Sequence, residues 1–258
     1  MRIAAVAVVL LSLVGAAPDT AAAYAQTAAP APPANARDAY NLACVHALAG
    51  KKGEAVAALG RAADLGFAYT STMLEPAPLI VALHGTGGTA EGFAPLWRRV
   101  ASDLGAVLAV PQGINPAGRG FDWGVVEQGS HLVLRAIERA RAEAEIDESR
   151  IVVAGFSNGA SQAFIQALLE PDRFAGVLSV SGFYDERVAP VRSGRRLPRF
   201  AILNGERDEE AGNNRRAARA LRAAGGKVKL EIYPGLGHSF PPDQERELRS
   251  ALEFLLRS

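Results

Sequence analysis

The chain has 258 residues, 49% of them hydrophobic, and a formal net charge of +1. This length accommodates one full α/β domain with a small appendage and excludes a second large domain. Because charges of both signs are interspersed, the sequence has no basic stripe that could follow a phosphate backbone, and we expect no nucleic-acid partner.

The amino-terminal segment has the pattern of an export signal. Met1 and Arg2 precede an apolar run over 3–17, and alanine-rich cleavage options follow at 21–23 and 23–25. The run is short for a membrane span of about 20 residues and suits a secretory signal. We expect residues 1–25 to be a signal peptide and the processed protein to be secreted or periplasmic, without stable membrane insertion. An uncleaved anchor is the alternative.

The next segment predicts a linker and a small helical module. Residues 26–36 are rich in alanine and proline and predict a flexible linker. Residues 37–67 hold two runs of helix formers separated by a glycine-bounded turn at 50–53, which predicts a helical hairpin. This hairpin resembles a single tetratricopeptide unit. Since about three repeats are normally needed for stability, it must pack on the domain that follows or, through residues 38–67, on a protein partner.

Strand and helix patterns alternate beyond Pro76, which predicts an α/β domain over 68–258 with a mainly parallel sheet and helices on both faces. Strands are expected near 79–84, 106–110, 150–154, 175–180, 199–204 and 228–233. Helices are expected over 90–104, 129–145, 158–169, 211–224 and 242–256. Residues 68–75 leave room for only one leading antiparallel strand.

The first of these strands runs into a glycine-rich loop, His84-Gly85-Thr86-Gly87-Gly88. Preorganised backbone N–H groups in such a loop can stabilise a developing oxyanion. A phosphate cradle is the competing interpretation, but the loop lacks the lysine and spacing of a P-loop. We therefore assign the Thr86 N–H as one oxyanion donor.

The residues Gly155-Phe156-Ser157-Asn158-Gly159 follow an apolar strand pattern and lead into a helix pattern. A serine on such a sharp turn is the pattern of a nucleophile elbow, in which the N–H of the next residue is an oxyanion donor. We assign Ser157 as the nucleophile and the Asn158 N–H as the second donor.

A serine nucleophile needs a base and a group that orients the base. In a triad built on a nucleophile elbow, the residues follow the chain order serine, acid, histidine. Of the four histidines, only His238 lies downstream of Ser157, in a loop between a strand and the last helix. The acid is expected after the strand at 199–204. We favour Asp208, with Glu206 as its competitor.

The segment over 181–198 is too short for a lid domain, so we expect an open cleft. Such a cleft favours water-soluble esters or an extended polymer over interfacial lipolysis. Trp123, Phe183 and Tyr184 are candidate pocket residues, with simple packing as the alternative. The histidines are scattered and suggest no metal site, and no cofactor is expected.

These motifs together resemble the α/β-hydrolase superfamily, specifically its phospholipase/carboxylesterase and polyester-depolymerase-like branches. The likeness rests on 83–88, 111–113 with Trp123, 155–159, Gly205 with Asp208, and 237–240. It covers residues 76–258 and implies a serine esterase with Ser157, Asp208 and His238 as its triad. Asn158 and Ala160 depart from the glutamine and glycine usual in the carboxylesterases.

The sequence therefore predicts an exported, lidless hydrolase that cleaves small or polymeric carboxylic esters through an acyl-enzyme on Ser157. Two alternatives remain: an envelope adaptor that binds partners through its helical hairpin, and a peptidase that uses the same triad.

Overall fold

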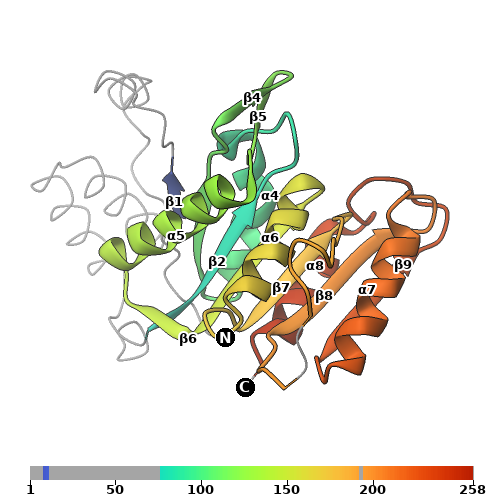
Figure 1. Cartoon of the computed structure of the whole chain (residues 1–258). Coiled ribbons are helices and arrows are strands. Elements are labelled where there is room, and N and C mark those ends of the chain that lie inside the picture. Colours follow the sequence, from blue (N-terminus) through green and yellow to red (C-terminus); the bar gives the residue numbers. More distant parts are fainter. Residues whose placement is uncertain (1–7, 12–75, 192–193, 258) are drawn as a thin grey trace, which may run out of the picture. The chain divides into compact units, whose positions relative to one another are not determined.

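The computed structural model describes residues 8–11, 76–191 and 194–257. Its centre is a seven-stranded sheet with the order β1-β3-β2-β6-β7-β8-β9, in which every pairing is parallel (Figure 1). The strands are β1 (Val8–Leu11), β2 (Ala77–Leu83), β3 (Val107–Pro111), β6 (Ile146–Phe156), β7 (Gly176–Val180), β8 (Arg199–Gly205) and β9 (Val228–Tyr233). The helices are α4 (Ala90–Asp103), α5 (Val126–Glu143), α6 (Asn158–Leu169), α7 (Ala211–Ala223) and α8 (Gln244–Leu255).

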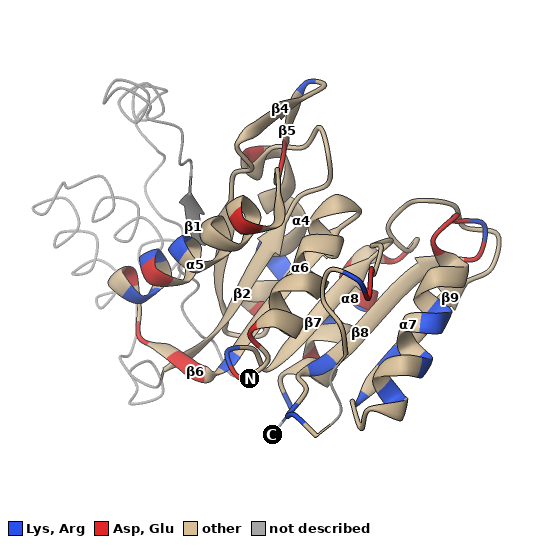
Figure 2. Ribbon diagram, viewed as in Figure 1, with Lys and Arg blue, Asp and Glu red and all other residues tan. Residues whose placement is uncertain are grey.

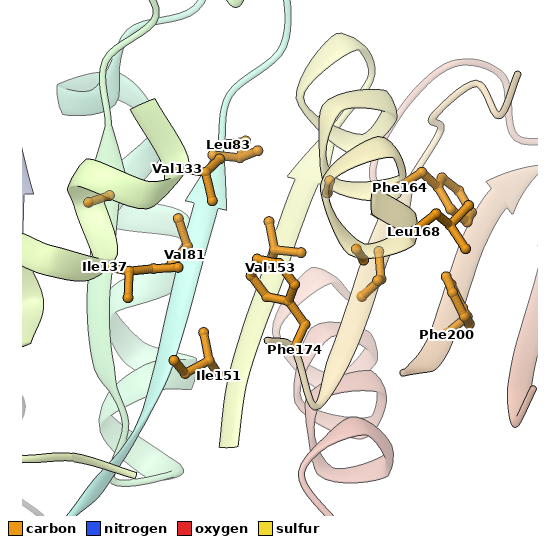
Figure 3. Close-up of a cluster of buried hydrophobic side chains, with 14 of the residues drawn as sticks. Val81, Leu83, Val133, Ile137, Ile151, Val153, Phe164, Leu168, Phe174 and Phe200 are labelled. Atoms are coloured by element: carbon orange, nitrogen blue, oxygen red, sulfur yellow. The ribbon is translucent and has the colours of Figure 1, made fainter. Parts of the chain in front are cut away.

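The sheet is buried on both faces because its strands are almost continuously apolar, as parallel strands covered by helices require. Alternate residues of β2 enter different cores: Val81 belongs to the core that includes residues of α5, α6 and α7, whereas Ile80 belongs to the core that includes residues of α4 and α8. Figure 3 shows the first of these cores, where Val133 and Ile137 of α5 face Val81 of β2. The fold is the predicted α/β arrangement, with helices on both faces.

Every predicted strand and helix of the domain over 76–258 occurs within a few residues of its expected position. A small antiparallel hairpin was not predicted: β4 (Asn115–Ala117) pairs with β5 (Gly120–Asp122), and β5 bridges Gly88 at Phe121. The segment between β7 and β8 holds no helix or strand in its described residues, which exclude 192 and 193.

The edge strand β1 falls within the segment predicted to be a signal peptide, and it pairs with β3 in the register Val8 to Leu108. Removal of residues 1–25 would take β1 away and leave β3 at the edge of a six-stranded sheet. The predicted linker, the helical hairpin and the leading antiparallel strand over 68–75 lie outside the described residues. Among the described residues, no helix is both long and apolar enough to cross a membrane.

Candidate active site

Ser157 occupies a strained turn between β6 and α6, with φ 54° and ψ −121°. Non-glycine residues rarely adopt positive φ, so the surroundings must hold the turn in place. The Ser157 N–H donates to the Val180 carbonyl of β7 at 2.9 Å. A side chain at Gly155 would meet the backbone of Gly159 at 2.4 Å, and one at Gly159 would meet the Leu83 carbonyl at 2.3 Å. The two glycines therefore allow β2, β6 and α6 to approach this closely.

The structure brings together the three side chains that the sequence predicted to form the triad. His238 Nε2 lies 2.9 Å from Ser157 Oγ, and His238 Nδ1 lies 3.0 Å from Asp208 Oδ2. The serine, imidazole and carboxylate thus form a continuous hydrogen-bonded chain, with the donor geometry that proton transfer from the hydroxyl requires.

The geometry distinguishes Asp208 from its competitor Glu206. Glu206 Oε2 instead accepts the Gly235 N–H at 3.0 Å. The Asp208 side chain is fully buried, whereas the His238 side chain is 43% exposed and reachable from solvent. Burial acts to raise the pKa of Asp208, but the Glu210 N–H, the Ser181 hydroxyl and His238 outweigh it, so the pKa is lowered and the group stays ionised.

The loop that carries Thr86 is fixed against the β4–β5 hairpin. The Gly87 N–H donates to the Phe121 carbonyl, and the Phe121 N–H donates to the Gly88 carbonyl, each at 3.0 Å. The Gly88 N–H donates to the Gly85 carbonyl, also at 3.0 Å. Two of the loop's amides are thereby used within the protein. The Asn158 N–H belongs to the first turn of α6, whose N–H groups have no acceptor inside the helix.

His84 anchors the start of this loop, a function that the sequence did not predict. Its side chain is buried, and Nε2 accepts the Gly113 N–H at 3.1 Å. Nδ1 must then carry the proton that is donated to the Gly85 carbonyl at 2.9 Å. Burial is the main cause that lowers the pKa of His84, which keeps the ring neutral, as this arrangement needs.

Gln112 and Trp123 complete the anchor. Gln112 Nε2 lies 3.2 Å from His84 Nε2, and Gln112 Oε1 accepts the Ala90 N–H at the start of α4, at 2.9 Å. Trp123 Nε1 donates to the His84 carbonyl at 2.8 Å. The Pro111-Gln112-Gly113 step and Trp123 were recognisable as part of the resemblance, but their contacts with His84 depend on the tertiary fold.

Aromatic rings support the loop that carries His238. Phe240 stacks on Phe156, the residue before the nucleophile, with ring centroids 4.7 Å apart. Phe156 also lies beside the His238 ring, with centroids 5.3 Å apart. The neighbouring residues Leu236 and Gly237 pack closely on Gly205. A side chain at position 205 would meet the Gly237 carbonyl at 2.2 Å. The imidazole is therefore held from two sides.

The three candidate pocket residues differ in exposure. Trp123 is 1% exposed, and its N–H is used by His84, so it is an interior anchor. Tyr184 is also buried and packs against Phe164, with its hydroxyl donating to the Ala189 carbonyl. Phe183 is 42% exposed, and its N–H donates to Ser161 Oγ on α6, one turn from the nucleophile. Phe183 is therefore the member of the three that a substrate could contact.

Within the described part of the chain, no cluster of histidine, cysteine and acidic residues could hold a metal ion.

The chain is similar in sequence to two known hydrolases. Acyl-protein thioesterase 1 of Gibberella zeae is 26% identical over 228 residues, which cover 75% of this chain and 95% of that protein. Poly(3-hydroxyalkanoate) depolymerase C of Paucimonas lemoignei is 32% identical over 121 residues, which cover 43% of this chain and only 29% of the depolymerase.

Solved structures share the fold at low identity. Esterase PE8 has a TM-score of 0.60 and 19% identity, with 70% of this chain and 97% of that chain covered. A carboxylesterase from Mesorhizobium loti has a TM-score of 0.58 and 19% identity, with 69% and 90% covered. These likenesses establish the α/β-hydrolase fold.

The family model described as Phospholipase/Carboxylesterase matches residues 126–257, just over half of the chain. This match includes the nucleophile turn, Asp208 and His238. The chain belongs to the phospholipase/carboxylesterase family of α/β-hydrolases.

Proposed function

We propose that this protein is an exported serine hydrolase that cleaves carboxylic esters through an acyl-enzyme on Ser157. The observation that carries the proposal is the pair of hydrogen bonds, 2.9 Å and 3.0 Å long, that joins Ser157 to His238 and His238 to Asp208. A serine hydroxyl is a weak nucleophile until a base takes its proton, and this chain of contacts supplies that base.

In the proposed reaction, His238 Nε2 takes the proton of Ser157 Oγ as that oxygen attacks the carbonyl carbon of the ester. The negative oxygen of the tetrahedral intermediate is stabilised by the main-chain N–H groups of Thr86 and Asn158. His238 then protonates the departing alcohol, and the acyl group remains on Ser157. Water, deprotonated by His238, then attacks the acyl carbon. The bond from that carbon to Ser157 Oγ breaks, His238 returns the proton to Oγ, and the acid leaves. Asp208 orients the ring and stabilises its charged form.

The range of substrates follows from the exposure of the site. Because His238 is 43% exposed and Phe183 is exposed nearby, the serine is accessible from solution. This arrangement suits short, water-soluble esters or one segment of a polymer. Thioesters are chemically related candidates because attack at an acyl carbonyl follows the same steps, and one relative is named as a thioesterase.

The test is an activity panel on the protein and on Ser157→Ala. The substrates are p-nitrophenyl esters of graded acyl length, an acyl thioester, a poly(3-hydroxyalkanoate) film and a peptide amide. We expect turnover of short esters by the wild type and a loss of at least about a thousandfold in Ser157→Ala, with an unchanged melting temperature. Equal ester turnover by Ser157→Ala would contradict the proposal, and hydrolysis of the amide alone would make the protein a peptidase.

A further inference from the structure

A second strained turn lies beside the triad at the end of β7. Ser181 has φ 51°, and among the described residues only Ser157 shares a positive φ without being glycine. Such a conformation costs on the order of 1–3 kcal/mol and persists only where the surroundings enforce it. Glycine would adopt it without strain, yet the chain has serine here and glycine at the next position, 182.

Four hydrogen bonds join the turn to β8, α6 and α7. The Ser181 N–H donates to the Leu203 carbonyl of β8 at 2.9 Å. The Gly182 carbonyl accepts Asn214 Nδ2 of α7 at 2.8 Å. The Phe183 N–H donates to Ser161 Oγ of α6, and the Tyr184 N–H donates to Asn213 Oδ1 of α7. The backbone of the turn is therefore fixed independently of the Ser181 side chain, so the serine is not needed to form it.

The Ser181 hydroxyl points into the space between the acid and the histidine loop. It donates to the carbonyl oxygen of Ser239, the residue after His238, at 3.4 Å, and it lies beside the Asp208 carboxylate, whose pKa it acts to lower. Asp208 Oδ1 is occupied by the Glu210 N–H at 3.0 Å, and Oδ2 faces His238. The residue is 1% exposed, so water cannot replace the hydroxyl without rearrangement.

We infer that Ser181 is a positioning residue for the reaction: its single hydroxyl proton, shared between the Ser239 carbonyl and the neighbouring Asp208 carboxylate, holds the His238 loop beside the acid. The inference rests on the proposed function, because the acid and histidine need this precision only if they serve Ser157. Ser181 directly follows β7, and its strained backbone directs the hydroxyl toward Asp208, which follows β8.

The test compares three single substitutions with a short p-nitrophenyl ester as substrate. Ser181→Ala removes the hydroxyl and keeps the strain, whereas Ser181→Gly removes the hydroxyl and relieves the strain. Ser179→Ala is the matched control, because Ser179 lies two residues earlier on the same strand, is equally buried, and has a hydroxyl without a partner among the described residues.

We expect kcat to fall about tenfold in both Ser181 variants, as for loss of one hydrogen bond to a charged group, with KM unchanged. Ser181→Gly should melt at a higher temperature than Ser181→Ala, so a loss of activity in the glycine variant cannot be attributed to unfolding. Ser179→Ala should retain the wild-type kcat. The rate of labelling by a fluorophosphonate should fall in parallel with kcat.

Wild-type kcat in Ser181→Ala, or its recovery in Ser181→Gly, would overturn the inference, as would an equal loss in Ser179→Ala. These results would leave the proposed function intact provided that the wild type is labelled at Ser157. A wild type that neither turns over esters nor reacts with the probe would contradict the proposed function as well.

Discussion

The two ends of the central sheet are built differently. At the carboxyl ends of the strands, polar side chains are buried and hydrogen-bonded, as His84 and Asp208 are, and two serines have strained backbones. At the amino ends, charged side chains form pairs at the surface, such as the exposed Arg141 with Glu148 and the partly buried Arg173 with Glu170. Figure 2 shows such charges on α5 and on the first part of β6. Buried, hydrogen-bonded polar side chains therefore lie at the carboxyl end of the sheet, whereas the charged pairs at its amino end lie at the surface.

The largest effect should come from Asp208→Asn, which breaks the buried polar arrangement at its centre. An amide cannot stabilise the charged imidazole and favours the wrong tautomer, so kcat should fall by about three to four orders of magnitude. The measurement is steady-state ester hydrolysis. Glu206→Gln is the control, because the competing acid contacts the Gly235 N–H and should be dispensable. A larger loss in Glu206→Gln would reverse the assignment of the acid.

Close backbone packing at the carboxyl end gives the next prediction. In Gly159→Ala the new methyl would lie 2.3 Å from the Leu83 carbonyl, so β2 and α6 must separate. We expect a loss of about 1–3 kcal/mol in the free energy of unfolding, together with reduced kcat as the two oxyanion donors move apart. Denaturant unfolding and kinetics measure the two effects.

The control for this change is Gly212→Ala. Gly212 lies in the first turn of α7, and a methyl there would meet only Arg216 Nη1, at 3.6 Å. Alanine is the better helix former, so this variant should be as stable as the wild type or more so. Equal destabilisation of both variants would show that the crossing of β2 and α6 has no special packing.

The pH dependence of stability sharpens the comparison through His84. Because burial lowers its pKa from the ordinary value of 6.5, the unfolded chain binds the proton more tightly than the folded protein. This contribution to stability is complete above pH 6.5 and declines as the pH falls below it, by at most about 1.4 kcal/mol per pH unit. Unfolding measured from pH 7 to pH 5 should show this slope.

In His84→Gln, the free energy of unfolding should depend less steeply on pH between 7 and 5. This holds even if the variant is less stable than the wild type at pH 7. The exposed His131 on α5 offers the matched substitution, and His131→Gln should retain the wild-type slope. An unaltered slope in His84→Gln would mean that the buried ring does not govern the acid sensitivity of the fold.

The smallest effect is expected at the amino end. Arg141 forms an exposed bidentate pair with Glu148. Exposed pairs contribute about 0–1 kcal/mol, so Arg141→Ala should change the melting temperature little and leave kcat unchanged. A loss of activity comparable to that of a change at the carboxyl end would remove the distinction between the two ends.

The sequence predicted the features whose signals are local. Apolar runs placed the strands of the domain, and the elbow around Ser157 is a five-residue pattern that requires only a strand before it and a helix after it. His238 followed from its position downstream of Ser157, between a strand and the last helix. Asp208 was preferred to Glu206 because an aspartate three residues after Gly205 matches the pattern of the family that the chain resembles.

The features that the sequence did not predict depend on contacts between distant segments. His84 is a neutral anchor because Gly113 and Gln112, about 28 residues away, converge on its ring. The strain at Ser181 is enforced by β8, α6 and α7 together. The β4–β5 hairpin is short and contains proline and glycines, so it carries little strand propensity of its own. Trp123 and Tyr184 are buried, which agrees with the packing alternative for aromatic residues near strand ends.

The activation of Ser157 by His238 is tested by reaction with a fluorophosphonate, with the modified residue mapped by mass spectrometry of peptides. We expect a single adduct on the peptide that contains Ser157, absent in Ser157→Ala and formed far more slowly in His238→Ala. An unlabelled wild type, or an adduct that persists in Ser157→Ala, would contradict it.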